Sequence, residues 1–332
     1  MFKKKLGFLL GVMVLLSLAG YLVCLLVGGS KQLNKEEDFL LVTSFYPMYV
    51  LAENLTDGVD GITVSNLTEN QTGCLHDYQL TSRDMKLLSR ADAFLVNGAG
   101  MELFMERVLE NNISLPVIEA SGGISLLEGV EHHHDHGEEE HGHDHDHETT
   151  GDEAGHAHTE NGHVWLDVEL HRAQLTTVKE ELQRLLPEQA GVLETVAKAY
   201  DEKLAVLSGE VADLKTKTEG VHVVIFHEAF AYLADSLGME VLMALSLDEE
   251  TVPSAGEIAE IIEEINYHGY ALILIEEAYA EYADKILAET AAEVVYVNPL
   301  TTGDGSIDSY LSGMQENIEA IRNVVEEVEH GR

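Results

Sequence analysis

The chain has 332 residues, and its 60 Asp and Glu against 19 Lys and Arg give a formal net charge of -41 at pH 7. This length is sufficient for two domains that each bury a core of their own. The strong negative charge excludes nucleic acid as a partner, because the phosphate backbone would be repelled rather than neutralised. It suits a protein that attracts cations.

The first 38 residues are expected to form a signal or anchor segment followed by a polar spacer. Three lysines at positions 3–5 precede an apolar run over residues 6–27, which is near the length that spans a bilayer. Either an uncleaved anchor or an exported, lipidated chain would follow from this pattern. Both predict a protein outside the cytoplasm, tethered to the outer face of the cell membrane.

The two cysteines bear on that choice. Residues 18–20, Leu-Ala-Gly, look like the start of a bacterial lipobox, but Tyr21 stands where the lipidated cysteine should be. Cys24 lies three residues later, and lipidation there and an intact anchor both stay open. The other cysteine, Cys74, is expected to be a free, partly buried thiol.

Strand and helix patterns alternate through residues 39–186. Pro47 and a capping box at Thr81 mark two of the helix starts. In chain order we expect a strand at 39–45, a helix at 47–55, a strand at 61–67, a helix at 81–88, a strand at 93–96, a helix at 102–109 and a strand at 115–118. This alternation predicts an N-terminal α/β lobe with a parallel sheet covered on both faces.

Two long helical patterns follow, over residues 167–186 and 187–217. In the second, apolar residues recur in three- and four-residue steps from Leu193 to Leu214, which is typical of a helix with one buried face. About thirty helical residues extend about 45 Å, more than a small domain needs. We therefore expect 187–217 to be a rigid helix that connects two lobes.

Alternation resumes in residues 218–332, which we expect to form a C-terminal α/β lobe. The expected elements are a strand at 221–226, a helix at 229–237, a strand at 240–245, a helix at 254–265, a strand at 271–275, a helix from 281, a strand at 293–297 and a final helix from 306. The predicted fold class is thus two parallel-sheet α/β lobes joined by a long helix.

The first lobe contains a histidine-rich tract at residues 131–162, with no aliphatic side chain larger than alanine. Such a segment cannot bury a core and is expected to be a mobile loop. Neutral imidazole flanked by carboxylates binds divalent metals such as zinc, so its histidines are candidate weak ligands. They are His132, His133, His134, His136, His141, His143, His145, His147, His156 and His158. Solvation alone, or a tag-like artefact, is the alternative explanation of the tract.

Three further histidines are candidate ligands of a tighter site. His227 directly follows a predicted strand, His76 lies in a loop after another, and His163 precedes the helices that lead to the second lobe. In open parallel sheets, ligands bind at the carboxyl ends of strands, so the three could meet between the lobes. One such histidine alone is more often a hydrogen-bonded structural residue. We prefer that structural role for His171 and His222.

These residues belong to a series of motifs, and with them the chain resembles the zinc- and manganese-binding solute receptors of bacterial ABC transporters, the cluster A-I family. The resemblance runs from about residue 39 to residue 327. The motifs are Thr43-Ser44-Phe45-Tyr46-Pro47, His76-Asp77-Tyr78, Ala91-Asp92-Ala93-Phe94-Leu95-Val96-Asn97-Gly98, His163-Val164-Trp165-Leu166-Asp167, Phe226-His227-Glu228-Ala229-Phe230, Pro253-Ser254 and Asn298-Pro299-Leu300.

The resemblance implies that metal binds in the cleft between the two lobes, with His76, His163 and His227 as ligands. It also implies that a histidine-rich loop before the second ligand is typical of receptors for zinc rather than manganese. Three neutral imidazoles favour zinc as well. Many relatives carry a carboxylate where Asn298 stands. The fourth ligand is therefore left open between Asn298, a water and Glu276, which follows the strand at 271–275.

The expected function is an extracytoplasmic receptor that captures Zn2+ and delivers it to an ABC permease driven by a cytoplasmic ATPase, acting as a monomer. A manganese receptor of the same family is one alternative, and a zinc-buffering or adhesive surface protein is another. A secreted zinc metallohydrolase is a third, because three histidines with an open position are also a catalytic arrangement. His227-Glu228 begins like a metalloprotease motif, but Ala231 stands where the second histidine is required. An enzyme is therefore not expected.

Overall fold

The computed structural model describes residues 38–68, 75, 78–104, 108, 114–129, 160–245 and 252–331. Within the described ranges, no helix is long and apolar enough to cross a membrane. The expected anchor segment lies outside these ranges, as do Cys24 and Cys74.

The first sheet has the strand order β2-β1-β3-β4. β1 pairs with β3 and β3 with β4 in parallel. The strands are β1 (Phe39–Thr43), β2 (Ile62–Asn66), β3 (Ala93–Val96) and β4 (Val117–Glu119), and the connecting helices include α2 (Tyr46–Thr56) and α3 (Ser82–Leu88). All four residues of β3 are buried, as expected for a central strand with both faces covered. The Thr81 capping box is present.

The second sheet has the order β10-β9-β7-β8, and all of its pairs are parallel. The strands are β7 (His222–Ile225), β8 (Glu240–Ala244), β9 (Leu272–Ile275) and β10 (Glu293–Tyr296), with helices α7 (Phe230–Ser236), α8 (Ala255–His268) and α9 (Ala280–Leu287) and the 3-10 turn η3 (Glu277–Tyr279). Side chains of β7, β9, α8 and α9 share one apolar core. The chain therefore has two parallel-sheet α/β lobes, which confirms the predicted fold class.

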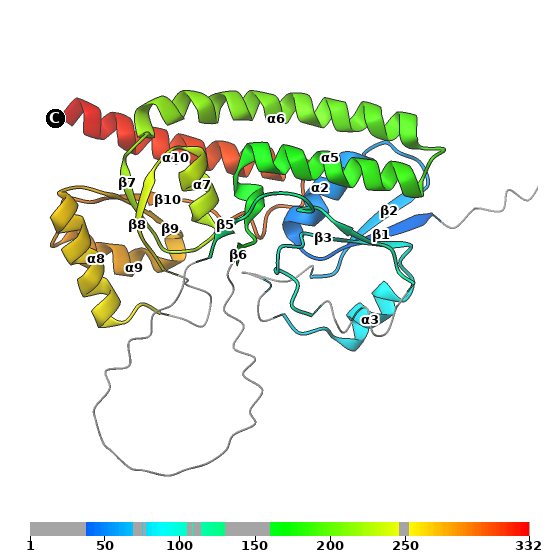
Figure 1. Cartoon of the computed structure of the whole chain (residues 1–332), viewed down its shortest axis with the longest axis horizontal. Helices are drawn as coiled ribbons and strands as arrows, with labels where there is room; N and C mark the ends of the chain where they lie inside the picture. The colour runs from blue at the N-terminus through cyan, green and yellow to red at the C-terminus, as the bar shows by residue number, and fades with distance from the viewer. Residues whose placement is uncertain are drawn as a thin grey trace, which may run out of the picture. The chain divides into compact units, whose positions relative to one another are not determined.

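Three long helices complete the described structure: α5 (Val168–Leu185), α6 (Ala190–Thr218) and α10 (Ser309–Gly331). α6 contacts α5, α2 and α10, and Figure 1 shows it running past both sheets. Its 29 residues extend about 44 Å. The buried residues of α6 recur from Leu193 to Leu214 at the spacing that the sequence predicts.

Two short features near the histidine-rich tract have no counterpart in the sequence prediction. β5 (Leu127–Glu128) pairs with β6 (Glu160–Asn161) in an antiparallel ribbon, and η2 (Val164–Leu166) is one 3-10 turn. Conversely, the helix expected at 102–109 does not include residues 102–104, and residues 103 and 104 form a turn instead. The carboxylate of Glu102 accepts the backbone N–H groups of Asn97 and Gly98, and this contact favours the turn.

Candidate metal centre

His163 is held by the buried turn that follows it. All three side chains of η2 are fully buried, so the turn has a fixed place in the core. The Trp165 indole donates a hydrogen bond to the Pro299 carbonyl at 2.9 Å, and its ring packs edge-on against Phe45 with centroids 5.1 Å apart. Trp165 therefore contacts a residue of each lobe, and His163 lies two residues away from it.

Asn161 determines which nitrogen of His163 carries the proton. The Asn161 side-chain oxygen lies 2.8 Å from His163 Nδ1 and also accepts the His163 backbone N–H at 3.0 Å. The Asn161 amide nitrogen donates to the Glu228 carbonyl, which fixes the orientation of the amide. An amide oxygen only accepts hydrogen bonds, so Nδ1 carries the proton and the lone pair is on Nε2. This is the arrangement that orients metal-binding histidines.

His227 lies just beyond β7, at the carboxyl end of the second sheet. It is 8 % exposed, and the backbone N–H of Ala229 donates to its Nδ1 at 3.0 Å. In the neutral ring the proton is then on Nε2. Binding a metal through Nε2 requires this proton to move, whereas binding through Nδ1 displaces the Ala229 N–H. Unlike His163, His227 must therefore change its contacts when it becomes a ligand.

The two rings lie at the separation that a shared zinc ion requires. Their centroids are 5.2 Å apart and their planes meet at 83°. Two imidazoles that each bind one tetrahedral zinc at about 2.0–2.1 Å have ring centroids about 5 Å apart. His163 is 2 % exposed, so both rings are buried. The pair fits two of the ligands of a zinc site.

The turn at residues 97–102 supports the His163 segment from the first lobe. The Asn97 amide donates to the Gly162 carbonyl at 2.9 Å, and a Cβ at Gly162 would lie 2.7 Å from the Met101 side chain. Only glycine allows this close approach. Burial raises the pKa of Glu102 to about 7, although the Ser44 hydroxyl and three backbone N–H groups favour its charged form.

The structure places both candidates for the fourth ligand at the carboxyl edge of the second sheet. β7 and β9 pair with Ile225 opposite Leu274, and continuing this register puts His227 opposite Glu276. Glu276 is partly buried, whereas Asn298 is exposed. The Asn298 side-chain oxygen already accepts the Leu300 N–H at 2.7 Å.

His163 and His227 are the predicted ligands that the structure brings together. His76 and the ten histidines of the tract lie outside the described residues. Among the residues that are described, no three His, Cys, Asp or Glu side chains lie closely enough together to hold a metal ion. Glu276 therefore does not complete a group of three with His163 and His227 in this structure.

His171 has the structural environment that the sequence favours. Its ring is buried, stacks on Tyr310 with centroids 3.9 Å apart, and lies within hydrogen-bonding distance of Gln174 and Tyr200. Burial lowers the pKa of His171 to about 4, so the ring is neutral near pH 7. It packs between helices rather than at a strand end.

Sequence reasoning overlooked Asn161 and Glu102. The tripeptide Asn161-Gly162-His163 carries a signal, because an Asn before a Gly is typical of a tight turn in which the Asn side chain bonds to backbone groups two residues on. No periodic pattern identifies Glu102 as a buried residue. Its role depends on the spatial proximity of Ser44, which is 58 residues away.

Comparison with known proteins gives consistent matches over most of the chain. Residues 41–324 match the family described as ZnuA, zinc-uptake complex component A, periplasmic. The chain is 28% identical over 322 residues to the zinc-binding lipoprotein AdcA of Streptococcus pneumoniae, a match that covers 94% of this chain and 61% of AdcA. It is 27% identical over 302 residues to the high-affinity zinc uptake system protein ZnuA of Bacillus subtilis, covering 87% of this chain and 88% of that protein.

The crystal structure of Zn(II)-bound AdcA from Streptococcus pneumoniae is similar in fold. It has a TM-score of 0.68 and 25% sequence identity, and the match covers 86% of this chain and 57% of that one. This chain thus spans about three fifths of the length of its streptococcal relatives.

Proposed function

Because the chain belongs to the ZnuA family of periplasmic zinc-uptake components, we propose that it binds Zn2+ outside the cytoplasm and delivers it to an ABC permease driven by an ATPase. The observation that carries this proposal is the buried pair His163 and His227, whose ring centroids lie 5.2 Å apart. Asn161 fixes the tautomer of the His163 ring and places its lone pair on Nε2.

The proposed ligands are His76, His163 and His227, with a fourth from the carboxyl edge of the second sheet. Glu276 is favoured over Asn298, since a carboxylate binds zinc more strongly than a neutral amide oxygen that already accepts a hydrogen bond. A water in the fourth position is the remaining alternative. Three imidazoles favour zinc over manganese, which prefers carboxylate-rich sites.

Metal competition tests the choice of metal and of the fourth ligand. The full chain, stripped of metal, is titrated with Zn2+ against a chelator of known affinity, with and without excess Mn2+. We expect one tight site that Mn2+ does not displace. Glu276→Gln should weaken this site, and Asn298→Ala should leave it within about threefold. The reverse result would make Asn298 the ligand, and displacement by Mn2+ would overturn the zinc assignment.

The histidine-rich tract is proposed to raise the local zinc concentration. With ten histidines among carboxylates, it should bind several ions weakly. Deleting residues 131–160 should remove these weak sites and leave the tight one. Loss of the tight site in the deleted protein would mean that the tract, not the histidine pair, holds the ion.

We also propose that the chain is exported, tethered to the membrane and monomeric, and that it takes part in zinc transport. Cells that lack the gene should lose uptake of radioactive zinc at low external zinc, and the full chain should restore it. Replacing Cys24 by Ala distinguishes lipidation from an intact anchor, since only a lipidated chain would be released from the membrane by this change. Restoration of uptake in cells without any permease would contradict delivery to a transporter.

The proposal also includes that zinc is cargo and not a catalytic cofactor. Ala231 stands four residues after His227, where a metalloprotease motif needs its second histidine. The zinc-loaded chain should not hydrolyse activated ester or peptide substrates faster than the metal-free chain. Zinc-dependent turnover that His227→Ala abolishes would support the hydrolase instead.

A further inference from the structure

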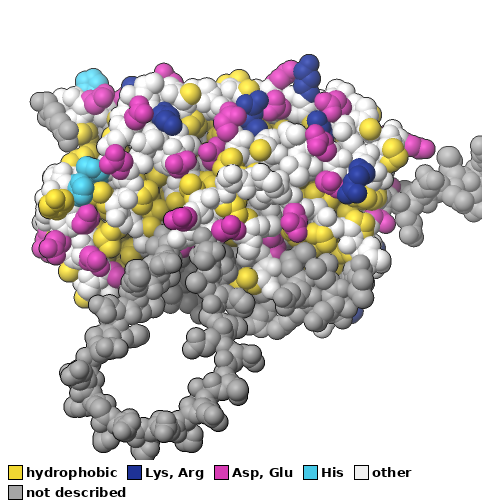
Figure 2. Space-filling view, viewed as in Figure 1, with side chains coloured by type: hydrophobic (Ala, Val, Ile, Leu, Met, Phe, Trp, Pro, Cys, Tyr) yellow, Lys and Arg dark blue, Asp and Glu magenta, His cyan; other side chains and the backbone are white. Residues whose placement is uncertain are grey.

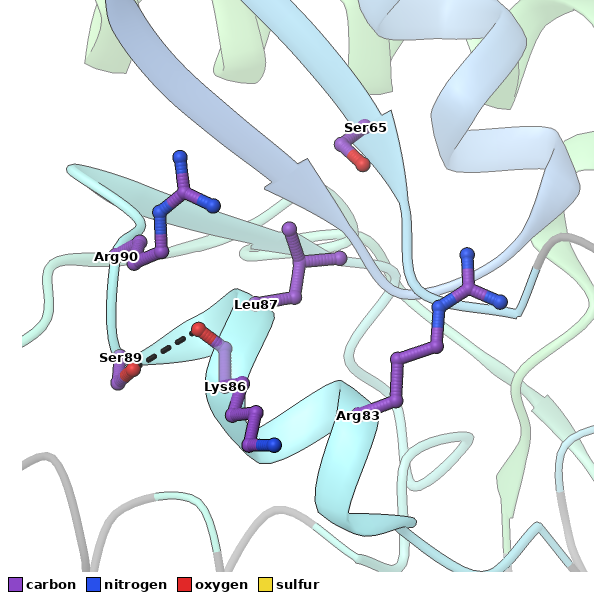
Figure 3. Close-up of a pocket in the computed structure, with 6 residues that line it drawn as sticks. All are labelled: Ser65, Arg83, Lys86, Leu87, Ser89 and Arg90. Atoms are coloured by element: carbon purple, nitrogen blue, oxygen red, sulfur yellow. Dashed lines mark hydrogen bonds between the residues drawn. The ribbon is translucent and has the colours of Figure 1, made fainter.

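Carboxylates that attract cations are abundant on this chain, where 60 Asp and Glu stand against 19 Lys and Arg. Figure 2 shows Asp and Glu predominating over Lys and Arg on the face in view. Such charge draws zinc to many places without selecting one. The pocket of about 570 Å3 beside α3 is not suited to zinc, because Figure 3 shows only Arg, Lys, Leu and Ser side chains along it. Tight binding at His163 and His227 therefore depends on how well their rings are held before the ion arrives.

The hydroxyl of Tyr232 forms two hydrogen bonds with the ribbon that leads to His163. It donates to the Asn161 carbonyl at 2.7 Å and accepts the Leu127 N–H at 3.1 Å. Leu127 and Asn161 lie opposite each other in β5 and β6, so the hydroxyl bridges the two strands. Burial raises the pKa of Tyr232, which keeps the phenol protonated and able to donate. A ribbon with two residues in each strand is not stable alone and depends on such contacts.

The chain between β7 and the first turn of α7 binds both the side chain and the backbone of Asn161. The Glu228 carbonyl accepts the Asn161 amide N–H at 2.9 Å, and the Tyr232 hydroxyl bonds the Asn161 carbonyl. The proposed ligand His227 directly precedes Glu228, and the proposed ligand His163 follows Asn161 by two residues. The two ligands are therefore tied to each other through Asn161, by contacts that need no metal.

We propose that Tyr232 is a positioning residue for zinc binding, which holds the Asn161 segment so that the His163 ring lies at the right distance from His227 before the ion binds. This inference rests on the proposed zinc-binding function. The Tyr232 hydroxyl is occupied by two backbone groups, so Tyr232 acts through Asn161 and not as a ligand. Without these bonds the ribbon would have to be ordered when zinc binds, and the cost of that ordering would lower the affinity.

The affinity test compares two buried tyrosines in the full-length chain, stripped of metal and titrated with Zn2+ against a chelator. Tyr232→Phe removes the hydroxyl and keeps the ring, and it should bind zinc about tenfold more weakly, as expected when a group that orients a ligand is lost. Tyr200→Phe is the matched control. Its hydroxyl lies 3.3 Å from Nε2 of His171, which is not a proposed ligand, so its zinc affinity should stay within about twofold of wild type. Circular dichroism should show that both variants are folded.

A second readout does not require zinc. The histidines are labelled with 15N, and the ring resonances of His163 are identified by their absence in His163→Ala. In the metal-free wild type and in Tyr200→Phe, the 15N shifts should place the ring proton on Nδ1, as the contact with Asn161 requires. In Tyr232→Phe the shifts should show a mixture of the two tautomers, because the Asn161 segment is no longer fixed.

Three outcomes overturn the proposal. If Tyr232→Phe lowers the free energy of unfolding in urea but keeps the zinc affinity within about twofold, Tyr232 only stabilises the fold. Equal losses of zinc affinity in Tyr232→Phe and Tyr200→Phe would indicate a general effect of removing a buried hydroxyl. An unchanged His163 tautomer in Tyr232→Phe would exclude an action through Asn161. Absence of tight zinc binding in the wild type would instead contradict the proposed function, and the tautomer of His163 would then decide whether Tyr232 positions that ring.

Discussion

Among the residues that the structure describes, two pairs of histidines are in edge-to-face contact, and they differ in burial and in the distance between the rings. His163 and His227 come from different lobes, are buried, and have ring centroids 5.2 Å apart. His222 and His268 both belong to the second lobe, have side chains that are 26% and 27% exposed, and have centroids 4.3 Å apart.

The difference shows that proximity of two imidazoles does not by itself make a metal site. The centroid distance of the second pair is shorter than the roughly 5 Å of a shared tetrahedral zinc. Its Nε2 atoms face carboxylates, His222 toward Glu240 at 3.4 Å and His268 toward Glu264 at 3.2 Å. In the first pair, Nδ1 of His163 faces the Asn161 amide oxygen instead of a carboxylate, which places the ring proton on Nδ1.

The largest expected effect is the loss of one proposed ligand. A structural zinc is bound by about 10–16 kcal/mol, so one of four ligands contributes about 2.5–4 kcal/mol, or about a hundred- to a thousandfold in Kd. His163→Ala and His227→Ala should each weaken the tight site by this amount in chelator competition. An affinity unchanged in both variants would refute the proposed centre. Circular dichroism should show that the variants remain folded.

The fold followed from the sequence because its main strands are unbroken apolar runs and its long helices are periodic. The continuous apolar runs at 93–96 and 271–275 are typical of buried parallel strands, and the repeated three- and four-residue steps of α6 have the period of a helix. The two-residue strands β5 and β6 are too short to show any period. Their pairing depends on contacts such as the Leu127 N–H to the Tyr232 hydroxyl, between residues 105 apart. Local patterns carry no information on such contacts.

The site was predictable only in part for the same reason. His163 and His227 could be selected because they adjoin strand ends and long helices. Asn161 could not, because its role depends on the Glu228 carbonyl, 67 residues away. The tautomer of His227 depends in turn on the local path of the chain at Ala229. The identities of candidate ligands can be read from sequence, but their protonation cannot.

His171 tests whether burial alone distinguishes the first pair. The folded-state pKa of His171 is about 4, below its usual value near 6.5, so the unfolded chain binds more protons between these pH values. Stability should therefore fall as pH drops from 6.5 to 4, by up to about 3 kcal/mol from this residue. His171→Gln lacks this titration. As the pH drops from 6.5 to 4, its free energy of unfolding should therefore rise relative to that of the wild type by the same amount, measured by urea unfolding without metal. A constant difference would mean that His171 is protonated in the fold.

Asn161 tests whether the fixed tautomer is what sets the first pair apart. Removing a group that orients a metal ligand costs about 10–100-fold in affinity. Asn161→Ala should weaken zinc binding by this factor. Asn161→Asp keeps an oxygen that accepts from Nδ1 and should retain most of the affinity. Equal losses in both would indicate that the bond from the Asn161 amide to the Glu228 carbonyl matters instead.

The smallest effect is expected at the second pair. Exposed ion pairs contribute about 0.2–1 kcal/mol, so His222→Ala and His268→Ala should each lower the free energy of unfolding by less than about 1 kcal/mol. Since neither residue is a proposed ligand, the double variant should keep the tight zinc affinity within about twofold. Chelator competition on this variant and on His227→Ala under one set of conditions compares the pairs directly. A tenfold loss of zinc affinity in the double variant would mean that His222 and His268 also bind zinc. The distance between ring centroids would then not distinguish a metal-binding pair of histidines from a structural pair.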